Sequence, residues 1–156
     1  MKLVLLSIGK TSQKHIQEGI KHYTARISRY MPIDIKELPD EKKVKGGIKG
    51  QKDKEASKIL SALPKSSCLV ALDEYGTEMG SVQFAKWMQK RMNSGVKNLV
   101  FSIGGPFGHG SELLEKADFK ISLSKMTFPH DLIRLLFVEQ LYRAMTILKN
   151  EPYHHK

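Results

Sequence analysis

The segment Leu99-Val100-Phe101-Ser102-Ile103-Gly104-Gly105-Pro106-Phe107-Gly108-His109-Gly110 indicates how this 156-residue chain folds. Its first five residues are largely apolar, which is typical of a strand buried on both faces of a parallel sheet. Four glycines follow within seven residues, and glycine lets the backbone approach a ligand closely. Ligands of open parallel sheets bind beyond the carboxyl ends of strands. We therefore expect a ligand at this loop, with ordinary turn formation as the alternative.

Apolar strands and amphipathic helices alternate along the chain, which predicts an α/β fold: a mainly parallel sheet with helices on both faces. The length fits a single domain spanning residues 1–156. The expected strands cover residues 3–8, 33–38, 68–73, 99–103 and 119–123, and the expected helices cover residues 16–30, 56–63, 82–92, 113–117 and 131–149.

Residues 40–54 combine six lysines with three glycines and have few apolar side chains. We expect a mobile basic loop there. The last expected helix, residues 131–149, is instead apolar around most of its circumference. One domain core rarely covers such a helix, so we infer that part of it packs against a second copy of the chain in a homodimer.

Lysine and arginine number 26 against 16 aspartate and glutamate residues, which gives a net charge of +10. Such a surplus favours a polyanion as partner, and nucleic acid is the leading candidate. No apolar stretch reaches the ~18 residues of a spanning helix, so a membrane partner is not expected. Cys68 is the only cysteine, which excludes an intrachain disulfide and a multi-cysteine zinc site. These features predict a cytoplasmic protein without a metal.

Two common phosphate-binding fingerprints are absent from the glycine-rich loop. Residues 105–111 imitate the Walker spacing, but Ser111 directly follows Gly110 where the phosphate-binding lysine would stand. The dinucleotide pattern G-x-G-x-x-G is also missing. A nucleotide-binding regulator is therefore the weakest of the functions considered.

Several motifs together resemble one family. They are the opening strand with Gly9, Leu72-Asp73, Gly104-Gly105-Pro106, Ser124-x-x-Thr127-x-Pro129-His130, Leu141-Tyr142-Arg143-Ala144 and Pro152-Tyr153-His154. From end to end, the chain resembles the RlmH family of small SPOUT-class methyltransferases. The resemblance implies a homodimer with a trefoil-knotted C-terminal half. It further implies methyl transfer from S-adenosylmethionine to N3 of a pseudouridine in 23S ribosomal RNA of the large subunit, on the assembled ribosome.

The resemblance also implies which residues bind the cofactor. They lie at the ends of three expected strands: Leu72, Gly104, Leu123, Ser124, Lys125, Met126, Thr127 and Phe128. Met126 and Phe128 have an alternative interpretation, because both side chains could simply fill core space.

The candidate catalytic residues are Arg143, His130 and His154. An imide nitrogen loses its proton well above neutral pH, so a cationic donor would favour the anion and a base could take the proton. Each candidate has a structural alternative. Arg143 could pair with Glu139 one helical turn away, His130 could pack at a helix start, and His154 could bind substrate without moving a proton.

Further residues are expected to bind the RNA substrate: Tyr153, Arg134, Lys43, Lys45 and Lys49. For the lysines the alternative is a solvated surface, although lysines among glycines suit phosphate contacts. The alternative function for the whole chain is a basic RNA-binding or ribosome-associated module without catalytic activity.

Overall fold

The computed structural model describes residues 1–155 and contains a five-stranded parallel sheet with the strand order β2-β1-β4-β3-β5. The strands are β1 (Lys2–Ile8), β2 (Ile33–Leu38), β3 (Ser67–Glu78), β4 (Asn98–Ile103) and β5 (Phe119–Ser122). The helices are α1 (Lys14–Ile27), α2 (Gly47–Ser61), α3 (Ser81–Asn93), α4 (Ser111–Lys116) and α5 (His130–Leu148). The predicted parallel α/β fold is confirmed.

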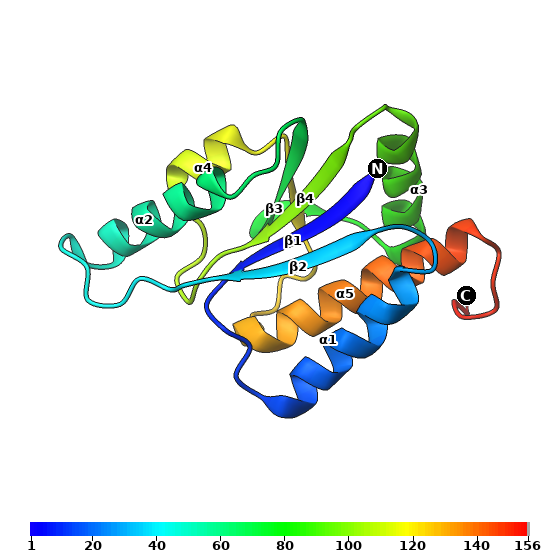
Figure 1. Cartoon of the computed structure of the whole chain (residues 1–156), viewed down its shortest axis with the longest axis horizontal. Coiled ribbons are helices and arrows are strands. Elements are labelled where there is room, and N and C mark those ends of the chain that lie inside the picture. The colour runs from blue at the N-terminus through cyan, green and yellow to red at the C-terminus, as the bar shows by residue number, and fades with distance from the viewer. Residues whose placement is uncertain (156) are drawn as a thin grey trace.

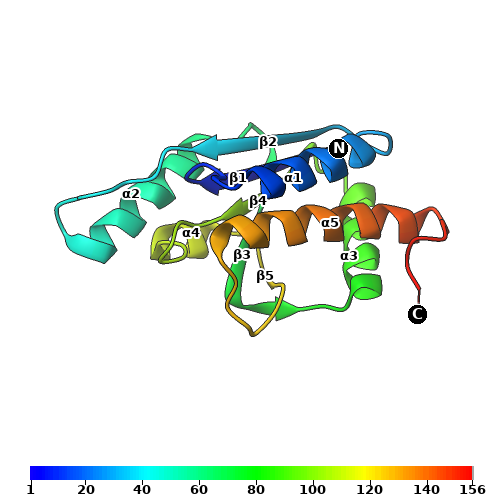
Figure 2. The same cartoon turned by 90° about the horizontal axis from the view of Figure 1, so that it is seen from below.

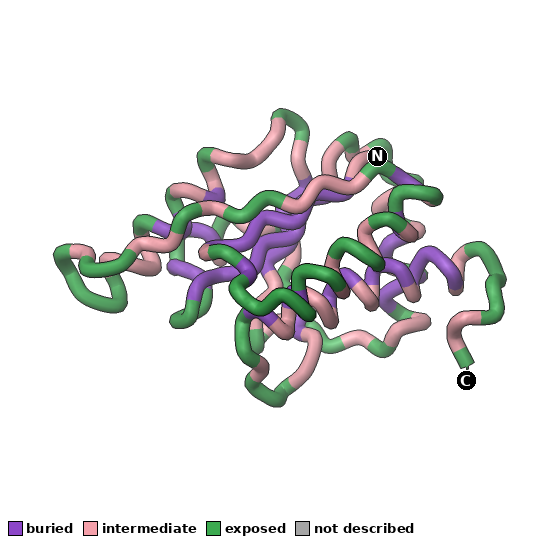
Figure 3. Tube along the Cα trace, turned by 60° about the horizontal axis from the view of Figure 1, so that its bottom comes forward, coloured by how far each residue is buried: buried purple, intermediate pink, exposed green. Residues whose placement is uncertain are grey.

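Helices cover both faces of this sheet, as Figures 1 and 2 show. Strand β1 explains the two layers, because its side chains alternate between faces. Leu3 and Leu5 join the core beneath α1, α3 and α5, whereas Val4 and Leu6 join the core beneath α2 and α4. Figure 3 shows buried residues gathered along the central strands. Within residues 1–155 no helix has the length and apolar character needed to cross a membrane.

The prediction of a mobile loop over residues 40–54 is wrong from Gly47 onward, where α2 begins. Glu55, Ala56 and Ile59 are buried and anchor the helix to the protein. Lysine is a good helix former, so the lysines can occupy the solvent-facing side of a helix that later residues hold in place. Within the segment predicted as a loop, only residues 40–46 lie outside helices and strands.

Strand β3 also differs from its prediction, because it continues past Asp73 to Glu78. Residues 73–76 therefore belong to an irregular stretch of strand rather than to a loop, and the pairing with β5 shifts register between Leu72 and Thr77. Gly76 allows the strands to come close: a Cβ atom there would lie 2.6 Å from the backbone of Ile121. Contact across the sheet decided this extension, and local sequence carried no sign of it.

Candidate functional site

A cavity of about 340 Å³ lies at the carboxyl ends of β3, β4 and β5. These strands are neighbours in the order β4-β3-β5 and run parallel, so the segments that follow them meet at one edge of the sheet. The prediction that three separated stretches share one rim is therefore confirmed. The lining residues are Leu72, Asp73, Glu74, Ile103, Gly104, Gly105, Pro106, Gly108, Ile121, Ser122, Leu123, Ser124, Met126, Thr127, Phe128, Pro129, His130 and Ile133.

Seven of the eight residues expected to bind cofactor line this cavity, and Lys125 does not. Lys125 instead borders a shallow neighbouring hollow beside Glu78 and Gly80. Met126 is 74% exposed, so it does not fill core space. Its backbone nitrogen donates a hydrogen bond to Ser124 Oγ over 2.9 Å, which holds the turn. The apolar walls contributed by Ile103, Ile121 and Ile133 were not predicted, although Ile103 ends one expected strand and Ile121 lies within another.

The glycine-rich loop folds back on itself at the cavity wall. A Cβ atom at Gly104 would lie 2.6 Å from the carbonyl carbon of Gly108, and Gly108 has a φ of +78° that favours glycine. Behind the loop, a Cβ atom at Gly105 would lie 2.6 Å from Oε2 of the buried Glu55. Glu55 thus supports the loop from α2, and nothing in its lysine-rich surroundings signalled that role.

His109 anchors the same loop from inside the protein. Its Nε2 atom lies 3.1 Å from the carbonyl oxygen of Ser102 and 3.4 Å from the Ser102 hydroxyl. Burial lowers the pKa of His109, because the charged imidazolium would lose its hydration. The ring is therefore neutral at neutral pH and holds the loop against β4.

We expect the protein to lose stability as the pH falls below about 6.5, the ordinary histidine pKa. The folded-state pKa of His109 is lower, so the unfolded chain takes up the proton first and gains stability from it. Thermal melts between pH 7.5 and 5.5 should show a steeper loss for the wild type than for His109→Gln. His22 is exposed, and His22→Gln should keep the wild-type slope; equal slopes for both variants would contradict the assignment.

The start of α5 holds two further predicted residues. His130 lines the cavity, and its Nε2 atom lies 3.4 Å from Oδ1 of Asp131. Burial tends to raise the pKa of Asp131, but hydrogen bonds from the Ser12 amide and hydroxyl and the charge of Arg134 lower it overall. Arg134 itself is 1% exposed and donates to the carbonyl oxygen of Ile8. The structure thus places it in the interior, away from the outer surface.

The other predicted site residues gather at the far end of α5. Nε and Nη2 of Arg143 donate to Oε1 of Glu139 over 3.0 and 2.5 Å, so the anticipated ion pair is present. The Tyr153 hydroxyl donates to the same oxygen over 3.0 Å, and Arg143 lies over the Tyr153 ring. Nη1 of Arg143 lies 3.4 Å from Nδ1 of His154. The tail therefore folds back onto α5.

Arg143 and Tyr153 both have raised pKa values in this cluster. The bonds to Glu139 raise the pKa of Arg143, and burial, followed by the bonds to Tyr23 and Glu139, raises the pKa of Tyr153. Both groups therefore stay protonated and act as donors. Because arginine can only donate, Nδ1 of His154 is the acceptor in its contact with Arg143.

The two groups of predicted residues are far apart within one chain. Thirteen residues separate His130 from Arg143 along α5, which corresponds to about 20 Å at 1.5 Å per residue. The structure therefore joins Arg143 to Tyr153 and His154, and joins His130 to the cavity loops. It does not bring all three catalytic candidates to one place in a single chain.

The predicted RNA-binding lysines are exposed on the segment that follows β2. Lys43 and Lys45 precede α2, and Lys49 lies in its first turn, where it pairs with Asp53 at 2.9 Å. Because β2 runs parallel to the other strands, these lysines lie toward the same edge of the sheet as the cavity. Among the described residues, no group of three or more potential ligand side chains is arranged to hold a metal ion.

A parallel sheet covered on both faces, with a cavity at the carboxyl ends of adjacent strands, defines a ligand-binding protein of the open α/β class. Residues 1–154 match the family model described as predicted SPOUT methyltransferase. The chain therefore belongs to the SPOUT methyltransferase family.

Full-length relatives share about half of the sequence. The chain is 50% identical over 157 aligned residues to proteins of Christiangramia forsetii and Flavobacterium johnsoniae, and 48% identical to one of Parabacteroides distasonis. All three are named ribosomal RNA large subunit methyltransferase H, and each alignment covers 100% of both chains. Among solved structures, the SpoU methyltransferase AviRb from Streptomyces viridochromogenes, in complex with AdoMet, aligns with a TM-score of 0.48. Its sequence is 14% identical, over 92% of this chain and 58% of that chain.

Proposed function

We propose that this chain transfers a methyl group from S-adenosylmethionine to N3 of a pseudouridine in 23S ribosomal RNA, on the assembled ribosome. The observation that carries the proposal is the cavity that is lined by the segments following β3, β4 and β5. Family membership and relatives named for the large subunit support the reaction and the RNA. Because ribosomes lie in the cytoplasm, the proposal also places the protein there. It further includes the trefoil knot that the family implies.

The residues of the cavity fit the proposed cofactor. A volume of about 340 Å³ lies within the range of 300–1,000 Å³ of small-molecule sites. Leu72, Ile103 and Leu123 offer apolar walls for a nucleoside, and the loops at Gly104 and Met126 offer backbone groups. The sulfonium of S-adenosylmethionine supplies an activated methyl group. The protein then has to align the acceptor and keep its nitrogen unprotonated.

Arg143 suits the second task. Glu139 fixes the guanidinium, which leaves Nη1 facing the tail and keeps the group cationic. A fixed cation beside an imide oxygen favours the deprotonated nitrogen. The Tyr153 hydroxyl already donates to Glu139, and Nδ1 of His154 already accepts from Arg143, so we assign both residues to substrate binding rather than to proton removal. Lys43, Lys45 and Lys49 would contact RNA phosphates.

A homodimer reconciles the separation of about 20 Å between the cavity and Arg143. If two chains associate with their α5 helices antiparallel, the C-terminal end of one α5 approaches the cavity of the other chain. Arg143, Tyr153 and His154 would then complete the partner's site. His130 would serve the cavity of its own chain, where it already lies.

The reaction can be tested directly. Purified protein and methyl-labelled S-adenosylmethionine are incubated with ribosomes from cells that lack the enzyme, with separated large subunits and with free ribosomal RNA. We expect saturable label in 23S RNA, and the largest amount with assembled ribosomes. Salt-sensitive RNA binding without cofactor binding or label would instead indicate an inactive RNA-binding module.

A further inference from the structure

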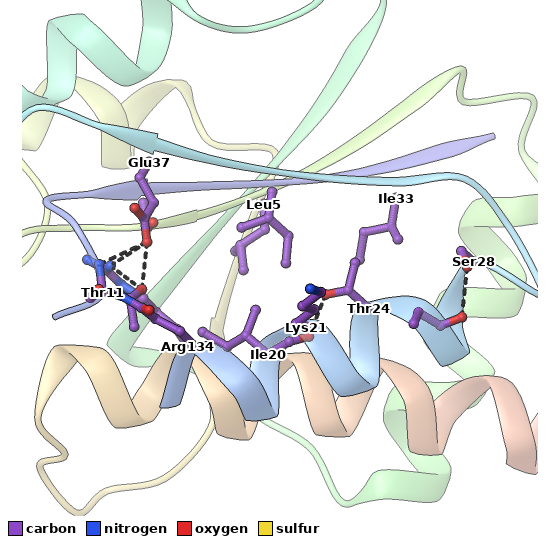
Figure 4. A pocket seen from close by; sticks show the side chains of 13 residues that line it. Leu5, Thr11, Ile20, Lys21, Thr24, Ser28, Ile33, Glu37 and Arg134 are labelled. Atoms are coloured by element: carbon purple, nitrogen blue, oxygen red, sulfur yellow. Dashed lines mark hydrogen bonds and ion pairs between the residues drawn. The ribbon is translucent and has the colours of Figure 1, made fainter. Parts of the chain in front are cut away.

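An apolar slot of about 530 Å³ lies between α1 and the inner face of β1 and β2 (Figure 4). At one end of it, the amide and hydroxyl of Thr11 donate to Oε1 of Glu37, and Nη1 of Arg134 donates to Thr11 Oγ1 over 2.9 Å. These bonds join the segment before α1 to β2 and to α5. The polar end of the slot is therefore explained by contacts within the protein.

Exposed apolar side chains gather instead at the edge of the sheet that carries the cofactor cavity, which we call the rim. Among residues 1–155, the large apolar side chains that are exposed are Ile48, Tyr75, Phe107 and Met126. They lie, in that order, at the start of α2, in the irregular end of β3, and on the segments after β4 and β5. Single exposed apolar residues are ordinary, but four at one edge of the molecule indicate a contact surface.

Phe107 stands at the tip of a tight turn. The turn spans Gly105–Gly108 and is closed by a hydrogen bond from the Gly108 amide to the Gly105 carbonyl oxygen over 3.0 Å. Pro106 occupies the second position, where its fixed φ favours such a turn, and Gly108 ends the turn with a φ of +78°. Phe107 is 47% exposed. The turn thus presents an aromatic ring to solvent at a fixed place, and little conformational freedom is lost when a partner packs on it.

The turn is held from two sides and borders the cavity. The buried Glu55 supports it from α2, and the buried His109 ties it to β4. Pro106 and Gly108 line the cofactor cavity, whereas Phe107 does not. The ring therefore lies beside the cavity and is free to contact a molecule other than the cofactor.

Acidic residues occupy one side of the rim. Asp73, Glu74 and Glu78 lie on the same end of β3 as the exposed Tyr75. Their negative charge repels phosphate groups. This side of the rim therefore does not suit a nucleic acid, although it carries an exposed aromatic side chain.

The other side of the rim, next to the turn of Phe107, carries lysines. Helix α2 packs on the glycine-rich loop there, since a Cβ atom at Gly110 would lie 2.7 Å from the carbonyl oxygen of Lys52. Lys43 and Lys45 precede this helix and are exposed, and among the described residues neither forms an ion pair. Each acidic residue within positions 40–54 is paired with a lysine: Asp40, Glu41 and Asp53. Positive charge on this side is therefore available to an anion.

An aromatic ring next to unpaired lysines suits single-stranded RNA. Unpaired bases stack on aromatic side chains, and any base can do so because each has a flat π face. The phosphates on either side of such a base need cations, which Lys43 and Lys45 offer. A second copy of the chain suits this side less well, because each copy has a net charge of +10 and their lysines would repel one another.

We propose that Phe107 stacks on an unpaired base of the RNA substrate, adjacent to the base that receives the methyl group. This inference rests on the proposed function and adds a contact that positions the RNA. Because the turn borders the cavity, a base stacked on Phe107 holds the strand where the neighbouring base can reach the cofactor. The phosphates of the strand lie toward Lys43 and Lys45.

The affinity of cofactor-saturated protein for ribosomes from cells that lack the enzyme measures the stack. Phe107→Ala should weaken this affinity by about 5- to 100-fold, the effect of losing one stacked base. Phe107→Leu should lose nearly as much, because leucine is apolar but has no ring, and Phe107→Trp should retain the affinity. Calorimetry with S-adenosylmethionine should give wild-type binding for all three variants, since Phe107 does not line the cavity, and thereby shows that the loop is folded.

Two controls separate stacking from charge and from general disturbance of the rim. Tyr75→Ala removes an aromatic side chain that is 88% exposed but lies on the acidic side, so ribosome affinity should not change. Salt titrations should give Phe107→Ala the wild-type slope, because no charge is lost. Lys43→Ala combined with Lys45→Ala should instead reduce the slope by about 2.

Photo-crosslinking identifies the partner. With p-benzoylphenylalanine in place of Phe107, irradiation of the protein with ribosomes should form a cross-link to 23S RNA. Three results would overturn the proposal: wild-type ribosome affinity in Phe107→Ala and Phe107→Leu, equal losses in Phe107→Ala and Tyr75→Ala, or a cross-link to a ribosomal protein or a second copy of the chain. Binding and cross-linking need no methyl transfer, so the failure of the proposed reaction is distinguished from the failure of the stacking contact.

Discussion

Gly104→Val is expected to weaken S-adenosylmethionine binding by about 5- to 150-fold. Even a Cβ atom at this position would lie 2.6 Å from the carbonyl carbon and 2.8 Å from the carbonyl oxygen of Gly108. These are backbone atoms of the cavity wall, so the clash could be removed only if the whole loop moved. Overpacking of this kind costs about 1–3 kcal/mol, and each 1.4 kcal/mol is a factor of about 10 in affinity.

Isothermal titration calorimetry with the cofactor measures this effect, and thermal melts establish that the variant is folded. Gly19→Ala is a suitable steric control, because its Cβ atom would meet the flexible Leu135 side chain at 2.8 Å and neither residue lines the cavity. Gly19→Ala should bind cofactor normally. A folded Gly104→Val protein with wild-type affinity would refute the assignment of the cavity.

Arg143→Ala is expected to reduce methyl transfer by about 10²- to 10³-fold, the effect of removing one charge-stabilising donor from an active site. Cofactor affinity should not change, because Arg143 is assigned to the acceptor base and is not one of the residues that line the cofactor cavity. Single-turnover labelling of ribosomes measures the rate. Lys149→Ala removes an exposed cation just beyond the same helix and should leave the rate unchanged.

Mixing the two inactive proteins tests whether the site spans two chains. If Arg143 acts on the partner's cavity, half of the dimers after exchange carry one variant of each kind. Each of those holds one intact site, so roughly a quarter of wild-type activity returns. Methyl transfer that stays absent after subunit exchange would place both residues at the same site of one chain.

Local pattern was sufficient for much of the site. Parallel strands bring their carboxyl ends to one edge of a sheet, so the apolar runs and the loops after them predicted a shared rim. The choice of Leu72, Gly104 and Leu123 within that rim came from the family resemblance. Ile121 and Ile133 were not predicted as site residues, because an apolar residue that lines a cavity cannot be told from a core residue in the sequence. The role of Glu55 was not predicted, because a carboxylate among lysines normally faces solvent. Here the glycine-rich loop packs against it and contributes to its burial.

Contacts between residues distant in the sequence account for the differences between the predicted and the observed secondary structure. Residues 47–54 became helical because Glu55, Ala56 and Ile59 pack on the protein, and β3 lengthened because β5 pairs with its irregular end. Neither contact is encoded within the segment it changes.

Sequence by itself determined the alternation of strands and helices, the parallel sheet, the basic charge and the glycine loop at a strand end. These features depend on periodicity and composition, which can be read from residues close together in the sequence. Tertiary structure alone decided that Arg143, Tyr153 and His154 stand together about 20 Å from His130, and that α1 leaves a slot above β2. Both follow from how whole helices pack, which is a sum of contacts between residues distant in the chain.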